Sequence, residues 1–158
     1  MHLTSRLAAT AVALLLLSAC ATNNSKVNLI APEFRIMQIT NVGEAARHVT
    51  GGLSVGFHAE ILNRSSETLT LRRIQLESMG EGAYYLPSTT RPFDLPVPPD
   101  QVAAVEMWVS ANIQSATILG ANGPVTIRAK VEFDSAEGMF QKIYVQQVNA
   151  GKPRPFND

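Results

Sequence analysis

The chain is poor in the features on which many folds and chemistries depend. It has 158 residues with a single cysteine, and its thirteen Lys and Arg balance thirteen Asp and Glu. One cysteine excludes a disulfide within the chain, so burial of apolar side chains must hold the fold together. A charge balance near zero argues against a nucleic-acid surface, which would need a basic stripe. We therefore expect one ordinary domain and no nucleic acid partner.

The motifs of common catalytic and phosphate-binding sites are also lacking. Nothing resembles a nucleophile elbow, and the sequence contains no glycine-rich phosphate loop. A serine triad need not be contiguous in sequence, so Ser54 or Ser88 could meet a histidine and Asp94 in space. Because no catalytic pattern is present, we predict that the protein is not an enzyme and holds no cofactor.

The histidines lack the spacing of metal ligands. We expect His48 in a loop and His58 on the polar face of a strand. His58 and Glu60 share that face, two residues apart, and could bind a metal only with a third group. A solvated face is the better interpretation, so we predict no metal site. The competing hypothesis is a small surface hydrolase or metal-binding protein that uses the His48 and His58 region.

The single cysteine, Cys20, lies where an apolar run meets a polar one. Residues 7–17 are apolar except for Thr10 and follow the positive charge of Arg6, which is the layout of a secretory signal. As a helix this run rises only about 16 Å, roughly half the hydrocarbon thickness of a bilayer, and is too short for a permanent span. Residues 1–19 are therefore predicted to be a signal peptide that is removed.

The residues at that boundary, Leu17-Ser18-Ala19-Cys20, resemble the lipobox of bacterial lipoproteins. The resemblance implies a diacylglyceryl group on the Cys20 sulfur, cleavage before Cys20 and acylation of the new amino group. Two or three acyl chains anchor a protein stably, whereas one holds it only marginally. Ala21, rather than Asp, follows the cysteine, which resembles the default for the outer membrane. We thus expect the membrane as a partner through lipid on Cys20, with the domain facing the periplasm.

Apolar and polar residues alternate through most of the remaining chain, and a period of two indicates strands with one wet face. The two clearest strands cover residues 53–62 and 125–133. A further strand over residues 68–77 switches parity at Arg72-Arg73, which suggests a bulge. Other strands are expected over residues 34–40, 83–86, 101–110 and 139–147. Clusters of Gly, Pro, Asn and Ser separate these runs.

Six or seven such strands predict an all-β fold, an antiparallel sandwich of about seven strands of the immunoglobulin or fibronectin III type. Its odd-numbered faces would be buried between two sheets, including Ile143 and Val145 in the last strand. We expect the sandwich over residues 29–150. A lipidated tether at residues 20–28 would precede it, and a flexible tail at residues 151–158 would follow it.

The order of these features resembles a known family over residues 34–148. A strand ending in Ile61-Leu62-Asn63, a polar turn, and Pro98-Pro99-Asp100 ahead of the next long strand resemble the late embryogenesis abundant type 2 domain, also called the water stress and hypersensitive response domain. That family usually shows Asn-Pro where this chain has Asn63-Arg64. The resemblance implies a fibronectin-like sandwich without catalytic residues, associated with stress protection.

Two aromatic residues are candidate partner contacts. Residues 86–99 hold five of the nine prolines. They are either a stiff exposed platform that offers Phe93 to a partner, or a crossover between sheets in which proline blocks edge pairing, and we favour the crossover. Trp108 lies on the face opposite Met107 and Val109. Alternation alone leaves Trp108 either a second core residue or an exposed interaction site.

Together these observations predict a lipid-anchored, non-enzymatic envelope lipoprotein. Its sandwich would bind or support another envelope protein, and stress protection is a subordinate form of the same hypothesis. A structural subunit of an envelope complex is a further alternative. Sandwiches host many functions, so the fold by itself does not choose among these hypotheses.

Overall fold

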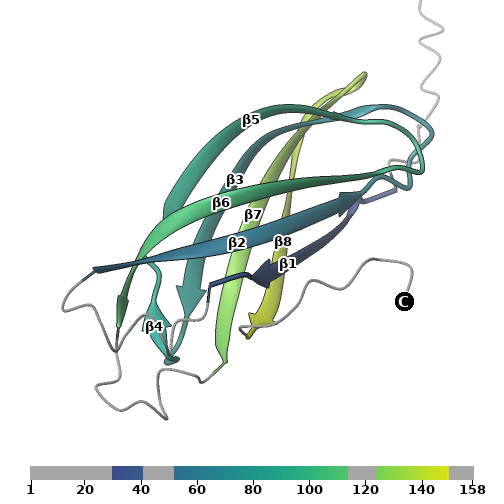
Figure 1. The fold of residues 1–158 in the computed structure, drawn as a ribbon. Coiled ribbons are helices and arrows are strands. Elements are labelled where there is room, and N and C mark those ends of the chain that lie inside the picture. Colours follow the sequence, from purple (N-terminus) through teal and green to yellow (C-terminus); the bar gives the residue numbers. More distant parts are fainter. Residues whose placement is uncertain (1–29, 41–51, 114–123, 150–158) are drawn as a thin grey trace, which may run out of the picture.

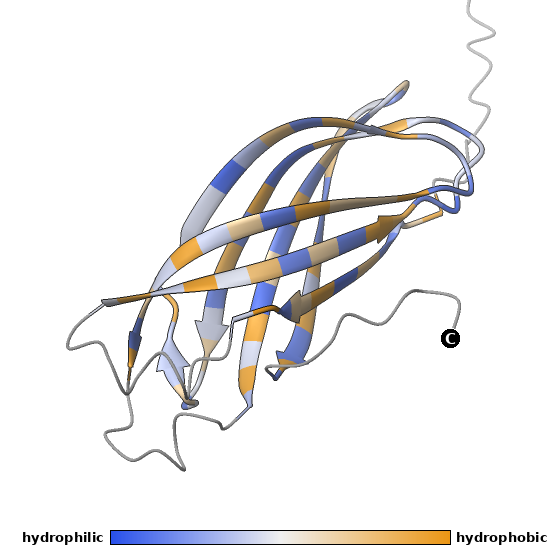
Figure 2. Ribbon diagram, viewed as in Figure 1, coloured by the Kyte–Doolittle hydropathy of each residue, from blue (hydrophilic) through white to orange (hydrophobic). Residues whose placement is uncertain are grey.

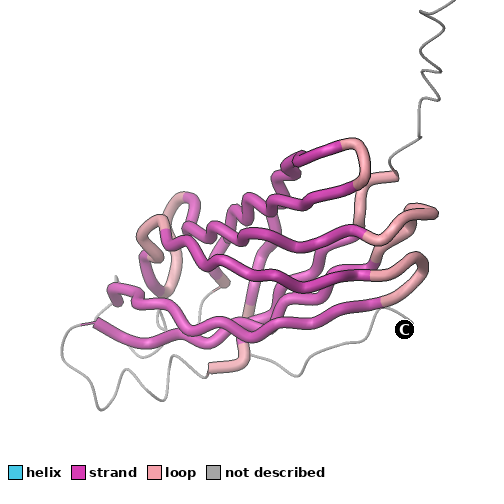
Figure 3. Tube along the Cα trace, turned by 90° about the horizontal axis from the view of Figure 1, so that it is seen from above, coloured by secondary structure: helices cyan, strands magenta, loops and turns pink. Residues whose placement is uncertain are grey.

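The structure is a computed structural model that describes residues 30–40, 52–113 and 124–149. Strands and loops make up these ranges, as Figures 1 and 3 show. The strands are β1 (Glu33–Gln38), β2 (Gly52–Leu62), β3 (Leu69–Met79), β4 (Tyr84–Tyr85), β5 (Thr89–Val97), β6 (Val102–Ile113), β7 (Val125–Ser135) and β8 (Gly138–Val148). No helix in the described ranges is long and apolar enough to cross a membrane.

Several predicted features lie outside the described residues. They are the signal peptide at residues 1–19, Cys20 with its lipobox and the tether at residues 20–28, His48, and the tail at residues 151–158. These stay predictions.

The strands form two antiparallel four-stranded sheets that pack face to face. The first sheet has the order β1-β2-β6-β4 and the second has the order β5-β3-β7-β8. Figure 1 shows β2 and β6 crossing in front of β3 and β7. The predicted fold class, an all-β antiparallel sandwich, is confirmed, with eight strands in place of about seven.

Alternating side chains from both sheets fill the space between them. Figure 2 shows the alternation as bands of opposite hydropathy along the strands. In β2 and β7 the odd-numbered residues point inward, and Phe57 and Phe133 are fully buried. The predicted bulge in β3 is also confirmed, because the pairing register shifts between Leu71 and Arg73. The shift keeps Ile74 inside although its parity differs from that of Leu71.

The proline-rich segment is a strand, which corrects the preferred interpretation as a crossover. β5 pairs with β3 and forms an edge of the second sheet. Proline lacks an N–H. An edge strand tolerates this because one side of its backbone makes no hydrogen bonds to a neighbouring strand. Pro92 and Pro96 therefore fit β5, while Phe93, Leu95 and Val97 face the core.

The last strand is also oriented differently from the prediction. In β8, Ile143 is 60% exposed and Val145 is 55% exposed, so the odd-numbered face points to solvent. The inner face is aromatic, because Phe140 stacks on Phe133 and Tyr144 stacks on Phe34. Ring packing of this kind adds to area burial, and it outweighs the smaller aliphatic side chains in setting the register.

Side chains close the seam between β1 and β8, which are edges of different sheets. The Gln146 side chain accepts a hydrogen bond from the Ile36 N–H at 2.8 Å and donates one to the Phe34 carbonyl at 3.0 Å. The Tyr144 hydroxyl donates to the Pro32 carbonyl at 2.5 Å. Burial raises the pKa of Tyr144 to about 12. Side chains thus satisfy backbone groups that an open sheet edge would leave unpaired.

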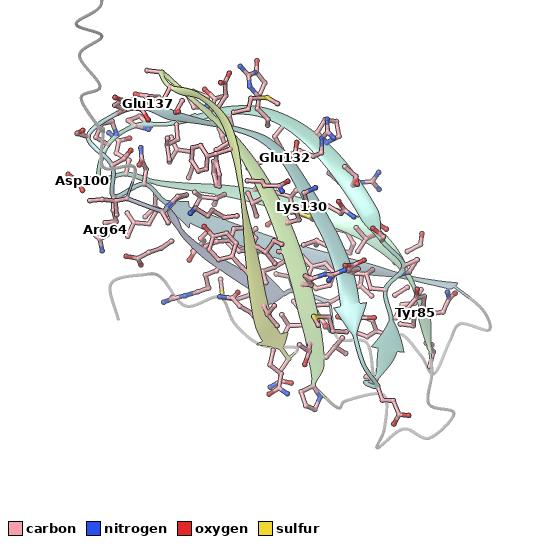
Figure 4. All side chains as sticks on the ribbon, turned by 180° about the vertical axis from the view of Figure 1, so that it is seen from behind. Arg64, Tyr85, Asp100, Lys130, Glu132 and Glu137 are labelled. Atoms are coloured by element: carbon pink, nitrogen blue, oxygen red, sulfur yellow. The ribbon has the colours of Figure 1, made fainter. Side chains whose placement is uncertain are left out.

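Asn63 joins the two sheets at one end of the sandwich. Its side-chain amide donates to the carbonyls of Glu67 at 2.7 Å and Val97 at 2.8 Å, and its carbonyl oxygen accepts from Ser65. The Asn63 backbone carbonyl accepts from the Asp100 N–H at 2.8 Å. Figure 4 labels Arg64 and Asp100 at this same end. Asn63 therefore fixes two turns although no proline follows it.

Candidate binding surface on the first sheet

The outer face of the first sheet carries the one tryptophan of the chain. Trp108 lies in β6 and is 52% exposed, while its neighbours Met107 and Val109 are buried. This decides the question that alternation left open, because Trp108 points away from the core. Single exposed apolar side chains are common on protein surfaces, but an indole offers a larger rigid surface to a partner than an aliphatic side chain does.

Gly56 explains how the indole lies. It stands directly opposite Trp108 in the pairing of β2 with β6. A Cβ built on Gly56 would come within 2.9 Å of two atoms of the six-membered ring, Cη2 and Cζ3, and within 2.9 Å of Ile39 Cγ1. Trp108 and Ile39 therefore meet over a glycine that has no side chain to hold them off. The sheet supports one side of the indole while the rest stays in solvent.

Hydrogen bonds to backbone groups hold this part of the sheet in place. The Gly56 N–H donates to Thr40 Oγ1 at 2.7 Å, and the Gly56 carbonyl accepts from the Ile39 N–H at 2.9 Å. On the other side, Arg91 of β5 donates to the Trp108 backbone carbonyl at 3.0 Å. The aromatic side chain thus projects from backbone that is bonded on both sides, which limits the entropy it would lose on binding.

A histidine between two carboxylates lies next to the indole. His58 Nε2 is 3.5 Å from Glu60 Oε1, and His58 Nδ1 is 3.8 Å from Glu106 Oε1. Glu106 is directly opposite His58 in the pairing and shares the outer face of β6 with Trp108. Glu60 is only 9% exposed, and its Oε2 has no hydrogen-bond partner within the described part of the chain. We call Ile39, Gly56, His58, Glu106 and Trp108 the Trp108 face.

The other predicted chemistry is not assembled. Asp94 pairs with Arg72 on the outer face of the second sheet, whereas His58 lies on the outer face of the first. Ser88 accepts a hydrogen bond from Gln75 at 2.7 Å, and Ser54 is exposed on β2. Within the described ranges, no group of three or more His, Cys, Asp or Glu is placed to hold a metal ion. His48, the other half of the competing hypothesis, lies outside these ranges.

The two predicted partner contacts differ in how much surface they offer. Phe93 is partly buried and packs against the core, since the odd-numbered face of β5 points inward. Trp108 is the better candidate because half of it stays exposed. Sequence reasoning missed Gly56, whose importance depends on the strand register. The sequence placed Gly56 on the polar face of its strand, but it could not show that Gly56 pairs with Trp108.

A second exposed apolar set runs along the outer face of β8. Met139, Ile143 and Val145 are 73%, 60% and 55% exposed. An open depression of about 190 Å³ beside Met139 is lined by Glu132, Met139, Phe140 and Gln141. A period of two finds such a stripe but does not say which face is inside, so the sequence placed it in the core.

Comparison with known proteins supports the fold alone. No family model matches the chain, and no match is found among curated protein sequences. Among solved structures, Northeast Structural Genomics Consortium target SoR45 is similar, with 11% identity, a TM-score of 0.51, and coverage of 78% of this chain and 88% of that one. A protein from Archaeoglobus fulgidus gives 8% identity, a TM-score of 0.48 and coverage of 74% and 94%. A Bordetella pertussis protein, target BeR40, has 8% identity and a TM-score of 0.49, and the match covers 78% of this chain and 94% of that one.

Proposed function

We propose that this protein is a lipid-anchored, non-enzymatic component of a bacterial envelope that binds another envelope protein through the Trp108 face. The observation that carries the proposal is the exposed indole held over Gly56 on a regular sheet. Tryptophan is enriched among residues that dominate binding energy, because it buries a large rigid surface at low entropy cost. The proposal includes, as a subordinate form, the stress protection that the family resemblance implies.

The anchoring part of the proposal depends on the lipobox residues, Leu17 to Cys20. Acylated Cys20 would hold the sandwich at a membrane surface, and residues 20–28 would separate the two. Binding at a surface gains from effective concentration, so a modest contact around one tryptophan suffices for a partner in the same membrane.

Fractionation of cells tests the anchor. The wild-type protein should sediment with membranes, and mass spectrometry should find a mature amino terminus at acylated Cys20. Cys20→Ser should abolish acylation and move the protein to the soluble periplasmic fraction. An unmodified amino terminus at another residue would remove the anchor from the proposal and leave the binding face untouched.

Site-specific photocrosslinking in intact cells tests the binding face. A photoreactive amino acid at Ser110, which lies on the outer face of β6 two residues beyond Trp108, should give a discrete adduct. The same group at Thr90, exposed on the edge strand β5, is the matched control and should give none. The Ser110 adduct should disappear when Trp108→Leu is added. A Ser110 adduct that persists in the Trp108 variant, with or without osmotic stress, would overturn the proposal.

A further inference from the structure

We infer that the Trp108 face takes a cationic side chain, an arginine or lysine of a partner polypeptide, against the exposed side of the indole. The inference rests on the proposed function and names the chemistry of the contact. A cation over the face of tryptophan is attracted by the negative potential of the ring. Trp108 offers such a face because Gly56 lets the ring approach the sheet while half of its surface stays open.

The charges around the indole favour a cation. Glu106 projects from the same face of β6 two residues away, and its side chain is 61% exposed. Within the described ranges its one ion-pair contact is His58 at 3.8 Å, a long contact that is ionic only when the histidine is protonated. A second carboxylate, Glu60, has an oxygen without a hydrogen-bond partner although the residue is nine-tenths buried. Glu106 is open to solvent and can accept hydrogen bonds from a bound cation, whereas buried Glu60 contributes only its negative charge.

The cations already near this face leave Glu106 available. Arg91 donates to the Trp108 backbone carbonyl at the seam with β5, and Arg64 pairs with Glu33 at 3.1 Å. Arg35 stands opposite Glu60 in the pairing of β1 with β2, two residues from the position beside His58. Glu106, on the far side of His58, has no lysine or arginine partner among the described ion pairs.

Arginine fits this arrangement best. Its planar guanidinium can stack on the indole and donate to a carboxylate at the same time. Glu106 and Trp108 are separated by two residues of an extended strand, about 7 Å, which a guanidinium on a flexible stem can bridge. An anionic group would be repelled by both glutamates, and a neutral sugar would use the ring but not their charge.

Fluorescence of the full chain tests the inference, because a single tryptophan makes the signal specific to this face. The probe is a short glycine peptide that contains two arginines, and its control is the same peptide with neutral citrulline in their place. The arginine peptide should change Trp108 emission saturably and in a salt-dependent way, whereas the citrulline peptide should bind at least about threefold more weakly.

Charge-neutral variants separate the site from general attraction. Glu106→Gln should weaken the arginine peptide about threefold. The matched control, Glu137→Gln, removes the same charge at the exposed β7–β8 turn labelled in Figure 4 and should leave the affinity unchanged. Circular dichroism melts check that both variants fold. Equal weakening in both variants, or equal binding of the citrulline peptide, would overturn the inference.

Two further outcomes keep this inference distinct from the proposed function. If a neutral chitotriose saturates the emission change and the arginine peptide does not, the face binds sugars and the inference fails. If the Ser110 photoadduct depends on Trp108 but is unaffected by Glu106→Gln and by excess arginine peptide, the proposed function stands and the cationic contact is wrong. Loss of the adduct in Glu106→Gln cells supports both.

Discussion

The outer faces of the two sheets differ in how their charged side chains are paired. On the second sheet, charged side chains from β3, β5 and β7 pair with one another. Arg72 contacts both Asp94 and Asp134, Arg128 contacts Glu77, and Glu132 contacts both Arg73 and Lys130. Figure 4 looks onto this face and labels Lys130 and Glu132. A partner that binds here must replace contacts that the protein already makes with itself.

On the first sheet, the part of the outer face around Trp108 carries fewer ion pairs among the described residues. Trp108 is half exposed over Gly56, and among the described residues the ion-pair partner of Glu106 is a histidine rather than a lysine or arginine. Both faces belong to four-stranded sheets that share one core. The charged side chains of the second sheet already pair with one another, so the outer face of the first sheet, with its exposed indole, is the better candidate for recognition.

The largest expected effects come from the inner faces, where the two sheets should behave alike. Phe57→Ala in the first sheet and Phe133→Ala in the second should each lower the free energy of unfolding by about 3 to 5 kcal/mol, because both side chains are fully buried. Urea titration measures both. Ile143→Ala on the exposed face of β8 is the control and should change stability by less than about 0.5 kcal/mol. A strong asymmetry between the two phenylalanines would mean that the sheets differ inside as well.

Alkaline pH should weaken the contacts at the sheet edges next. Burial raises the pKa of Tyr144 to about 12 and raises that of Tyr84, whose hydroxyl donates to Gln38 at 2.7 Å. Each neutral phenol is favoured in the folded state, so its contribution is fully present below about pH 10 and is lost as the pH rises toward the folded pKa. The melting temperature should therefore fall above about pH 10. Tyr144→Phe should flatten this dependence, and an unchanged profile in that variant would contradict the assignment.

Much of the fold could be predicted from alternation alone. The long strands β2 and β7, the bulge near Arg72 and the short strand β4 follow the predicted pattern. β5 was misassigned because proline usually interrupts a strand. An edge strand tolerates proline, and Phe93 and Leu95 of β5 still pack against the core. β8 was inverted because a strand with apolar residues on both faces carries no parity signal, and aromatic packing across the sheets then decides.

The candidate site could be predicted only in part. The sequence shows that Trp108 lies on the strand face opposite Met107 and Val109. It also shows that His58 and Glu60 lie on one face of their strand. Their relation to Gly56 and Glu106 depends on how β2 and β6 align, a non-local fact that a sequence pattern does not contain. The turn at Asn63 shows the same limit, since its hydrogen bond to Val97 joins residues 34 positions apart.

A side chain at Gly56 should disturb the first sheet with little loss of stability. In Gly56→Ala the new methyl group pushes against Trp108 and Ile39, while the strand gains from losing a flexible glycine. These effects oppose each other, so the free energy of unfolding should change by about 1 kcal/mol or less. Trp108 emission should shift to the red as the ring lifts into water. Gly52→Ala is the control, because its Cβ would meet only the Ala111 carbonyl at 4.0 Å.

The smallest effect should come from the paired charges of the second sheet. Arg72→Met removes contacts to Asp94 and Asp134 but keeps the apolar stem, and pairs this exposed contribute little individually. The free energy of unfolding should fall by about 0.5 kcal/mol at low salt, and the difference should shrink in high salt because screening weakens exposed pairs. Trp108 emission and arginine-peptide affinity should not move. A loss above about 2 kcal/mol would instead make this charged face part of what holds the sheets together.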